Sequence, residues 1–153
     1  MHAESPPGPG LATARLSRVV DGDTLALADG SRVRLIGVNA PEIHGDGGRP
    51  EPGARDAERF AREFLGSGRI GLVKGSDPAD RYGRTLAHVY RADGASLEAA
   101  LLSAGLARQV TIPPNLGMLD CLREAERQAR VARNGLWASG FFSPRDVSGL
   151  VPG

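Results

Sequence analysis

The sequence of 153 residues has little of several features that define particular protein classes. Its single cysteine, Cys121, excludes an intrachain disulfide and a cysteine-based zinc site. No apolar run is long enough to span a membrane, so we expect no membrane partner. The first residues lack the basic segment and apolar run of a signal peptide. The formal net charge is only +1, so binding of a polyanion would depend on local arginines rather than on overall charge.

Turn-forming residues divide the chain into three parts. The 11 prolines and 21 glycines are concentrated at both ends and in residues 45–53. We therefore expect a disordered leader over residues 1–11, one domain over 12–140 and a loose tail over 141–153. A domain of this length can bury a core without disulfides. We also expect the protein to be a monomer.

Five strands are predicted in the N-terminal part of the chain, over residues 12–20, 24–28, 32–38, 69–73 and 85–90. Asp29-Gly30 is a typical hairpin turn between the second and third of them. In the third strand Val33 and Leu35 alternate with Arg34, so Arg34 points away from the apolar face. The long polar segment 39–53 is expected to be a functional loop.

Apolar residues recur at helical spacing in three segments, 57–65, 96–104 and 118–133. Ser96 provides an N-cap for the second segment, and glycines follow the ends of all three. Mostly antiparallel strands that precede most of the helices predict an α+β protein. A five-stranded Greek-key barrel of the OB-fold type with three α-helices fits this count, and periodicity alone does not separate it from other α+β barrels.

The first of three polar clusters that could carry chemistry is Asp21-Gly22-Asp23-Thr24. Its two carboxylates lie at a tight turn, where they could face one hard cation. Aspartate and glycine are also favoured in ordinary turns for backbone reasons. Taken alone, this segment is better explained as a plain turn.

The second cluster runs from Arg34 to Glu42. Asn39 and Glu42 flank a bend that Pro41 stiffens. The bend could direct a side-chain oxygen, a backbone carbonyl and a carboxylate at one point. The alternative is a strand end followed by a polar loop, with Arg34 exposed to solvent as most arginines are.

The third cluster is Asp80-Arg81-Tyr82-Gly83-Arg84. Two arginines around a tyrosine could grip a phosphate, because the planar guanidinium group makes paired hydrogen bonds to phosphate oxygens. Asp80 is expected to hold this loop in shape. Without further context, a charged surface loop is the better explanation.

Taken together, in this order and spacing, the clusters resemble the staphylococcal nuclease family. The matching stretches are VDGDTL (residues 20–25), RLIGVNAPE (34–42), DRYGRTL (80–86) and EAERQARVARNGLW (124–137). The resemblance covers residues 14–137. It implies an OB-fold nuclease that hydrolyses phosphodiester bonds of DNA with little sequence preference, with RNA as a further candidate substrate.

The resemblance assigns roles to individual residues in catalysis. It implies that Arg34 and Arg84 bind the phosphate and that Glu42 is the essential carboxylate. Tyr82 matches a tyrosine that contacts the substrate phosphate. A further pair of tyrosines in the family archetype has no clear match here, because residues 111–114 occupy that region.

The resemblance also implies a bound Ca²⁺. Asp23, Asn39 and the backbone carbonyl of Ala40 match its ligands, and Asp21 adds charge behind them. The archetype has aspartate where this chain has Asn39. An amide oxygen is a legitimate Ca²⁺ ligand but carries no charge, so affinity is expected to fall, or another divalent ion to be accepted.

Two alternatives to a nuclease stay open at this point. One is a non-catalytic OB-fold module that binds nucleic acid or a protein, and the other is a domain that binds Ca²⁺ for stability only. The presence of Asp23, Arg34, Glu42 and Arg84 together argues against the first alternative. Asn39 and the missing tyrosines favour it. Family analogy favours a secreted or periplasmic protein, and the sequence itself leaves the compartment open.

Overall fold

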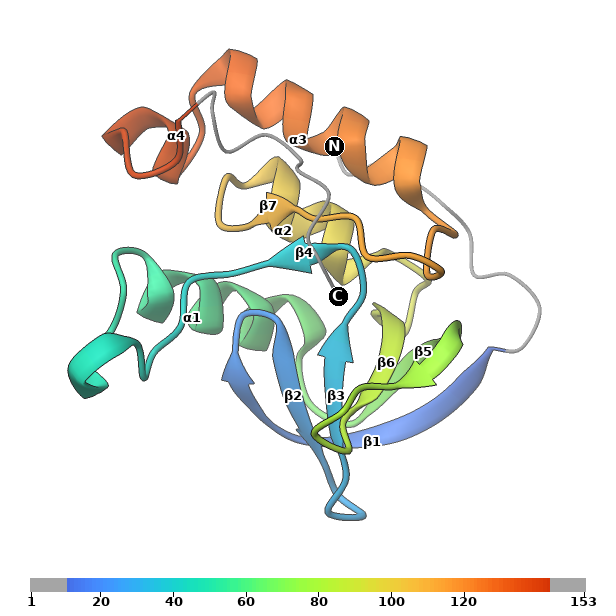
Figure 1. Cartoon of the computed structure of the whole chain (residues 1–153). Helices are drawn as coiled ribbons and strands as arrows, with labels where there is room; N and C mark the ends of the chain where they lie inside the picture. Colours follow the sequence, from blue (N-terminus) through green and yellow to red (C-terminus); the bar gives the residue numbers. More distant parts are fainter. Residues whose placement is uncertain (1–10, 144–153) are drawn as a thin grey trace.

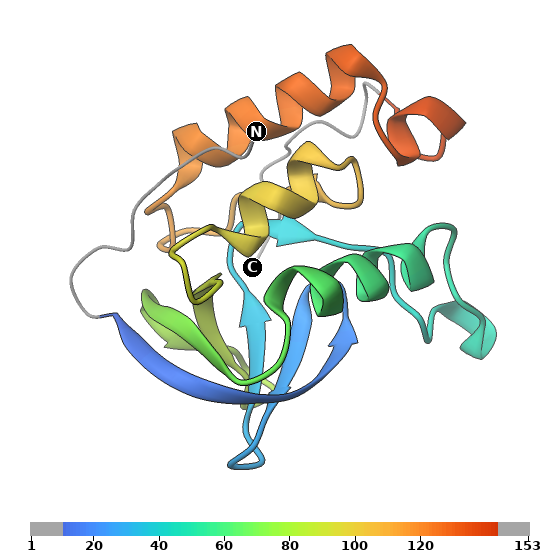
Figure 2. The same cartoon turned by 180° about the vertical axis from the view of Figure 1, so that it is seen from behind.

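The computed structural model of this protein describes residues 11–143. Residues 1–10 of the expected leader and 144–153 of the expected tail lie outside the described residues. None of the helices within residues 11–143 is long and apolar enough to cross a membrane. Helices lie above a barrel of strands in Figure 1, and Figure 2 shows the same two layers from behind.

Five strands form a closed barrel in the order β1-β2-β3-β6-β5, as the sequence predicted. They are β1 (Ala12–Asp21), β2 (Thr24–Leu27), β3 (Arg32–Leu35), β5 (Arg69–Ala79) and β6 (Thr85–Tyr90). Only the β3–β6 pair is parallel among these strands. The first half of β1 pairs with β5 and the second half with β2. A register shift between Leu16 and Arg18 allows the strand to bend between the two partners.

The three predicted helices are present, and a fourth single turn follows them within the described residues. The helices are α1 (Ala54–Leu65), α2 (Leu97–Ser103), α3 (Leu119–Ala132) and α4 (Leu136–Ser139), and a short 3₁₀ turn, η1, covers Asp46–Gly48. The hydroxyl of Ser96 accepts a hydrogen bond from the Ala99 N–H at 3.1 Å and so caps α2. The buried residues of α1 lie on one stripe at helical spacing.

A large core fills the barrel and the space beneath the helices, and a smaller cluster lies at the far end of α3. The smaller cluster contains Ala129, Leu136, Trp137 and Phe142. The Phe142 ring meets the Trp137 ring edge-on at 5.3 Å between centroids. Trp137 is therefore an anchor of this smaller cluster. Ordered packing also extends past residue 140, where we expected the domain to end.

The predicted strand over residues 32–38 is interrupted. β3 ends at Leu35, and the two-residue strand β4 (Val38–Asn39) pairs with β7 (Arg108–Gln109) instead. Gly37, with a φ of +88°, turns the chain between them, a conformation that glycine adopts without steric cost. This turn carries the segment after β3 out of the barrel and toward the helices. It thereby sets the position of the polar loop that follows.

The hairpin between β5 and β6 extends further than the sequence predicted. β5 was expected to end at residue 73 but continues to Ala79, where it pairs with Thr85 across a register irregularity. The backbone N–H of Asp80 donates to the Arg84 carbonyl at 2.9 Å and closes the turn. The segment expected to be a charged surface loop is therefore held at the end of a hydrogen-bonded hairpin.

Candidate active site

The turn between β1 and β2 buries one carboxylate. Asp23 is 4% exposed. Its Oδ2 accepts a hydrogen bond from the Ala40 N–H at 2.8 Å, and its Oδ1 accepts one from the Thr24 hydroxyl at 3.0 Å. A Cβ on Gly22 would lie 2.8 Å from the Cβ of Ala57, so α1 can approach this turn only because residue 22 is glycine. The turn, α1 and the loop after β4 are thus fixed together.

Arg34 connects this turn to the bend after β3. Its Nη1 donates to the carbonyls of Leu35 at 2.7 Å and Val38 at 2.8 Å. Its Nη2 donates to Asn39 Oδ1 at 3.2 Å and lies 3.5 Å from Asp23 Oδ2. The side chain is 17% exposed. The guanidinium group therefore braces the bend and holds the side chains of Asn39 and Asp23 at one place.

Glu42 lies beside several other carboxylates. Partial burial raises its pKa above the ordinary value, and the charges of Glu51, Asp21 and Asp23 raise it further. The positive charge of Arg34 acts in the opposite direction. The net effect is a raised pKa, and among the charged groups that act on Glu42 three carboxylates stand against one arginine. A carboxylate pKa shifted by burial and neighbouring charges is typical of functional sites.

Backbone contacts hold the loop that carries Glu42. The Glu42 N–H donates to Glu51 Oε1 at 2.6 Å, and the Ile43 N–H donates to Asp21 Oδ1 at 3.0 Å. Through these contacts and those of Arg34, the structure brings most of the predicted site residues together. The gathered residues are Asp21, Asp23, Arg34, Asn39, Ala40 and Glu42, which we call the carboxylate cluster.

Arg84 and Tyr82 form a neighbouring group at the tip of the β5–β6 hairpin. Asp80 Oδ1 accepts the backbone N–H groups of Tyr82 and Arg84, both at 2.9 Å, and its Oδ2 accepts from Arg84 Nε at 2.7 Å. These bonds to Arg84 and Tyr82 outweigh burial and lower the pKa of Asp80. Asp80 therefore holds the loop, as the sequence suggested. Tyr82 is 69% exposed, with the guanidinium carbons of Arg81 and Arg84 at 5.0 and 5.6 Å from its ring centroid.

Arg84 and Tyr82 lie beside the carboxylate cluster along the sheet. β6 runs parallel to β3, with Arg34 opposite Leu86. Arg84 precedes Leu86 by two residues, which corresponds to about 7 Å along a strand. Within residues 11–143, Arg84 is paired with Asp80 rather than with Asp23 or Glu42. The two arginines thus lie on adjacent chain segments without a direct link between their side chains.

A pocket of about 210 Å³ opens beside the carboxylate cluster. Its lining residues are Asn39, Ala40, Pro41, Glu42, Glu51, Arg108, Phe141 and Phe142. Sequence reasoning did not find the last four of these. Arg108 reaches the pocket because β7 pairs with β4, a contact between segments distant in sequence that no local pattern announces.

The donor atoms of the carboxylate cluster suit a hard cation. They are carboxylate, amide and carbonyl oxygens, the ligands that Ca²⁺ prefers. Within residues 11–143 no group of three or more histidine, cysteine, aspartate or glutamate side chains is arranged to hold a metal ion. A cation would therefore also need the amide of Asn39 or a backbone oxygen. The surplus negative charge around Glu42 is a reason for a divalent cation to bind here.

Fold and site together define an OB-fold protein whose barrel strands and adjoining loops gather arginines and carboxylates beside a pocket. The sequence model of a protein family described as staphylococcal nuclease homologue matches residues 32–139 of this chain. The chain belongs to the staphylococcal nuclease family, as the sequence motifs predicted.

Three relatives illustrate this membership. The chain is 35% identical to endonuclease YncB of Bacillus subtilis over 148 residues, which cover 92% of this chain and 69% of the relative. It is 35% identical to thermonuclease of Staphylococcus intermedius over 125 residues, with 80% and 74% covered. It is 33% identical to the SPbeta prophage-derived endonuclease YokF of Bacillus subtilis, of which the match covers 49%.

Proposed function

We propose that this protein is a Ca²⁺-dependent nuclease that hydrolyses phosphodiester bonds of DNA and RNA with little sequence preference. The observation that carries this proposal is the position of Arg34, held by Asp23 and Asn39 beside Glu42 at the edge of a pocket. The family membership supports it, and relatives named endonuclease and thermonuclease agree with it. Contacts to phosphate carry no base information, which accounts for the low sequence preference.

Phosphodiester cleavage builds negative charge on the phosphoryl oxygens, and two arginines would stabilise it. Two backbone carbonyls fix Nη1 of Arg34, so the guanidinium group would present its positive charge to the phosphate from a set position. Arg84 is fixed by Asp80 and would bind the same phosphate from the adjacent strand. Tyr82 would contact a phosphate of the substrate from the exposed tip of the hairpin.

Glu42 would orient the attacking water and accept its proton. Its raised pKa makes it a better proton acceptor than an ordinary glutamate. Asp23, Asn39 and the carbonyl of Ala40 would hold the Ca²⁺, and Asp21 would add charge nearby. When bound, the cation would neutralise charge on the phosphate and help position the water.

The test is cleavage of plasmid and single-stranded DNA with Ca²⁺ or with chelator, by the wild type and by Arg34→Ala and Glu42→Ala variants. We expect Ca²⁺-dependent degradation that both variants lose almost completely. Arg32→Ala is the matched control, because Arg32 is an exposed arginine on the same strand. It should cleave like the wild type.

Other outcomes of the same experiment would overturn the proposal. Binding of DNA without cleavage would identify a non-catalytic module. A Ca²⁺-dependent rise in melting temperature with neither cleavage nor binding would identify a structural cation site. Equal degradation by the wild type and both variants would show that these residues do not form the active site. A parallel assay with RNA tests the second substrate.

We also propose that the protein acts as a monomer, since one chain supplies every residue of the proposed site. Sedimentation of the active protein as a single species of 16.0 kDa would agree with this. A species of twice that mass would contradict it. A secreted or periplasmic location remains a prediction that depends on the family alone.

A further inference from the structure

The pocket beside Glu42 has a wall that the proposed chemistry does not use. That wall consists of Glu51, Arg108, Phe141 and Phe142. We propose that this pocket binds one nucleobase of the substrate strand, stacked on Phe141 and contacted at its edge by Arg108. The inference rests on the proposed nuclease function and adds a subsite to it. We call the cavity the base pocket.

The base pocket is continuous with the carboxylate cluster. Asn39, Ala40 and Glu42 belong to both. Across the β4–β7 pair, Arg108 lies directly opposite Asn39, whose side chain accepts a hydrogen bond from Arg34. A group bound in the pocket would therefore adjoin a phosphate held by Arg34.

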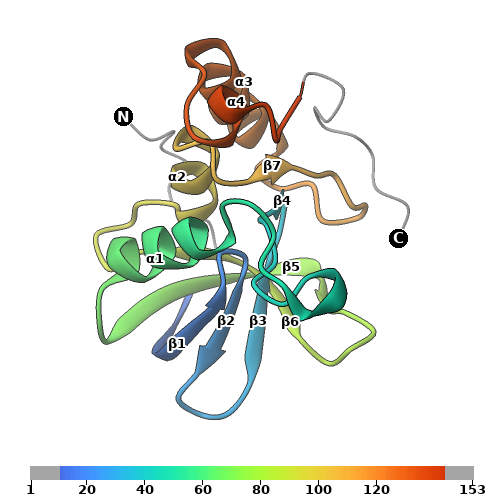
Figure 3. The same cartoon turned by 90° about the vertical axis from the view of Figure 1, so that its left-hand side faces the viewer.

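The two adjacent phenylalanines have different environments. Phe142 is 3% exposed and packs against Trp137, with the Arg108 guanidinium carbon 5.6 Å from its ring centroid. Phe141 is 42% exposed and leans on Phe142 at 5.7 Å, with 38° between the rings. Figure 3 shows the segment after α4 passing beside β7. Phe142 thus anchors the segment, and Phe141 presents an open aromatic surface to the pocket.

The charges of the lining favour a base over a phosphate. Glu42 and Glu51 place two carboxylates on the pocket against the single guanidinium group of Arg108, so the side chains of the lining carry net negative charge. A nucleobase has no charge and offers both hydrogen-bond donors and acceptors at its edge, which match carboxylate and guanidinium groups. Its flat face stacks on aromatic side chains. The volume of about 210 Å³ lies below the roughly 300 Å³ at which pockets begin to hold drug-sized ligands, which suits a single base.

The register of the strands gives the substrate a path. Arg84 and Tyr82 lie beside the start of β3, Arg34 lies within β3, and the base pocket lies beyond β4. A strand that contacts the hairpin tip and passes over Arg34 therefore continues toward the base pocket. Stacking on an aromatic ring tolerates every base, so the subsite agrees with low sequence preference.

Replacement of Phe141 tests the inference. With a single-stranded DNA oligonucleotide and Ca²⁺, Phe141→Ala should raise KM about tenfold and leave kcat nearly unchanged, because stacking acts on binding. Phe141→Trp should keep the wild-type KM. Phe141→Leu retains apolar volume without an aromatic face, so its KM should also rise while its melting temperature stays unchanged. Val131→Ala is the matched control, since Val131 is 69% exposed on α3.

A second readout separates the base pocket from the nuclease reaction. An oligonucleotide that contains the fluorescent base 2-aminopurine should be quenched on binding to the wild type and less so by Phe141→Leu. A wild-type KM for both Phe141→Ala and Phe141→Leu would overturn the base pocket while leaving the nuclease proposal intact. Absence of cleavage by the wild type would refute the nuclease function. In that case unchanged oligonucleotide affinity of Phe141→Leu would overturn the base pocket independently.

Discussion

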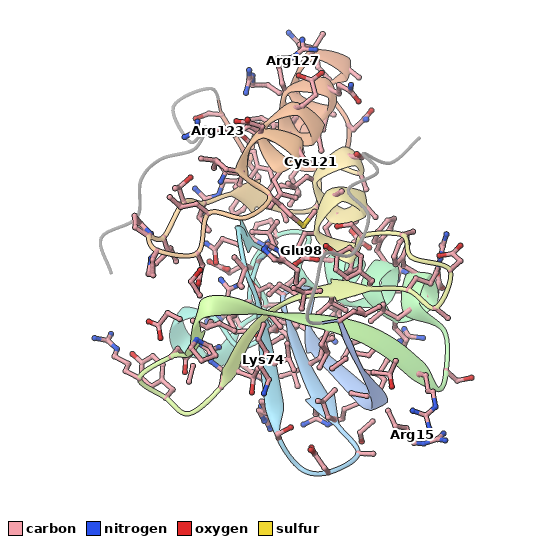
Figure 4. The ribbon with its side chains drawn as sticks, turned by 90° about the vertical axis from the view of Figure 1, so that its right-hand side faces the viewer. Arg15, Lys74, Glu98, Cys121, Arg123 and Arg127 are labelled. Carbon is pink, nitrogen blue, oxygen red and sulfur yellow. The ribbon has the colours of Figure 1, made fainter. Side chains whose placement is uncertain are left out.

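The carboxylate of Glu98 and the carboxylate cluster lie in different surroundings. Glu98 is fully buried between α2 and the barrel (Figure 4). It accepts a hydrogen bond from the Val89 N–H at 3.1 Å, and the Nδ1 of His88 lies 3.0 Å from its Oε2. The carboxylate cluster instead borders a pocket, where partial burial and the negative charges of neighbouring carboxylates raise the pKa of Glu42.

The comparison shows that burial of a carboxylate is by itself no sign of function. Glu98 is matched by partners inside the core, as buried polar groups usually are. In the carboxylate cluster, like charges accumulate around one arginine beside an opening. Titratable groups perturbed by neighbouring charges beside a cleft are frequent at functional sites. Like charges gathered beside an opening, rather than burial alone, mark the candidate site.

The largest expected effect tests whether the active region reaches the β5–β6 hairpin. Arg84→Ala should lower the cleavage rate about 10²-fold, because one fixed donor to the transition state is lost. Arg81→Ala is the matched control: Arg81 lies over the same tyrosine ring, but Asp80 binds Arg84. Rates from plasmid cleavage compare the two variants. A wild-type cleavage rate for Arg84→Ala would limit the active region to the carboxylate cluster.

The next effect concerns the stability of the core around Glu98. Glu98→Ala should lower the free energy of unfolding by about 3 kcal/mol, because it leaves His88 and the Val89 N–H in the core without their partner. Urea unfolding measures the change. Glu124→Ala, which removes an exposed carboxylate on the outer face of α3, should change stability little. Loss of cleavage by folded Glu98→Ala protein would contradict the division between the two regions.

A smaller effect is expected at Asn39, the proposed cation ligand that departs from the family archetype. Asn39→Asp should lower the Ca²⁺ concentration for half-maximal cleavage by about tenfold, because an added ligand charge strengthens Ca²⁺ binding. A Ca²⁺ titration of the cleavage rate measures this shift. No change in the Ca²⁺ requirement would remove residue 39 from the cation site. Asn115→Asp adds the same charge outside the carboxylate cluster and serves as the control.

The smallest expected effect is a change in the pKa of Glu42. Glu51→Gln keeps an oxygen that can accept from the Glu42 N–H but removes the charge of Glu51, the strongest of the charges that raise the pKa of Glu42. In the Ca²⁺-free protein, the Glu42 pKa should therefore fall in this variant yet stay above its ordinary value, since partial burial remains. NMR titration of the Glu42 carboxyl measures it. An unchanged pKa would show that the carboxylates do not interact.

Local patterns in the sequence predicted the five barrel strands and three helices, because side-chain periodicity and glycine stop signals act over short distances. They could not predict β4 and β7, which have two residues each and exist only because they pair with one another. The single turn α4 was missed for a similar reason: its residues are held by Phe142 and the end of α3.

The candidate site also has one part that the sequence predicted and one part that it did not. Motifs identified Asp23, Arg34, Glu42 and Arg84, because the family pattern fixes their order along the chain. The wall with Arg108 and Phe141 depends on tertiary pairing and carries no local signal. The partners of Arg34 were also outside prediction, since the bend at Gly37 was expected to be part of a continuous strand.

The most direct measurement compares cleavage and stability in Glu42→Gln. The Glu42 pKa is higher in the folded state than its ordinary value, so ionisation of Glu42 costs stability as the pH rises through that folded pKa. At neutral pH without Ca²⁺, the variant should therefore melt no lower than the wild type. With Ca²⁺, it should lose cleavage of plasmid DNA almost completely. Cleavage at the wild-type rate by the folded variant would contradict the assignment of this cluster as the active site.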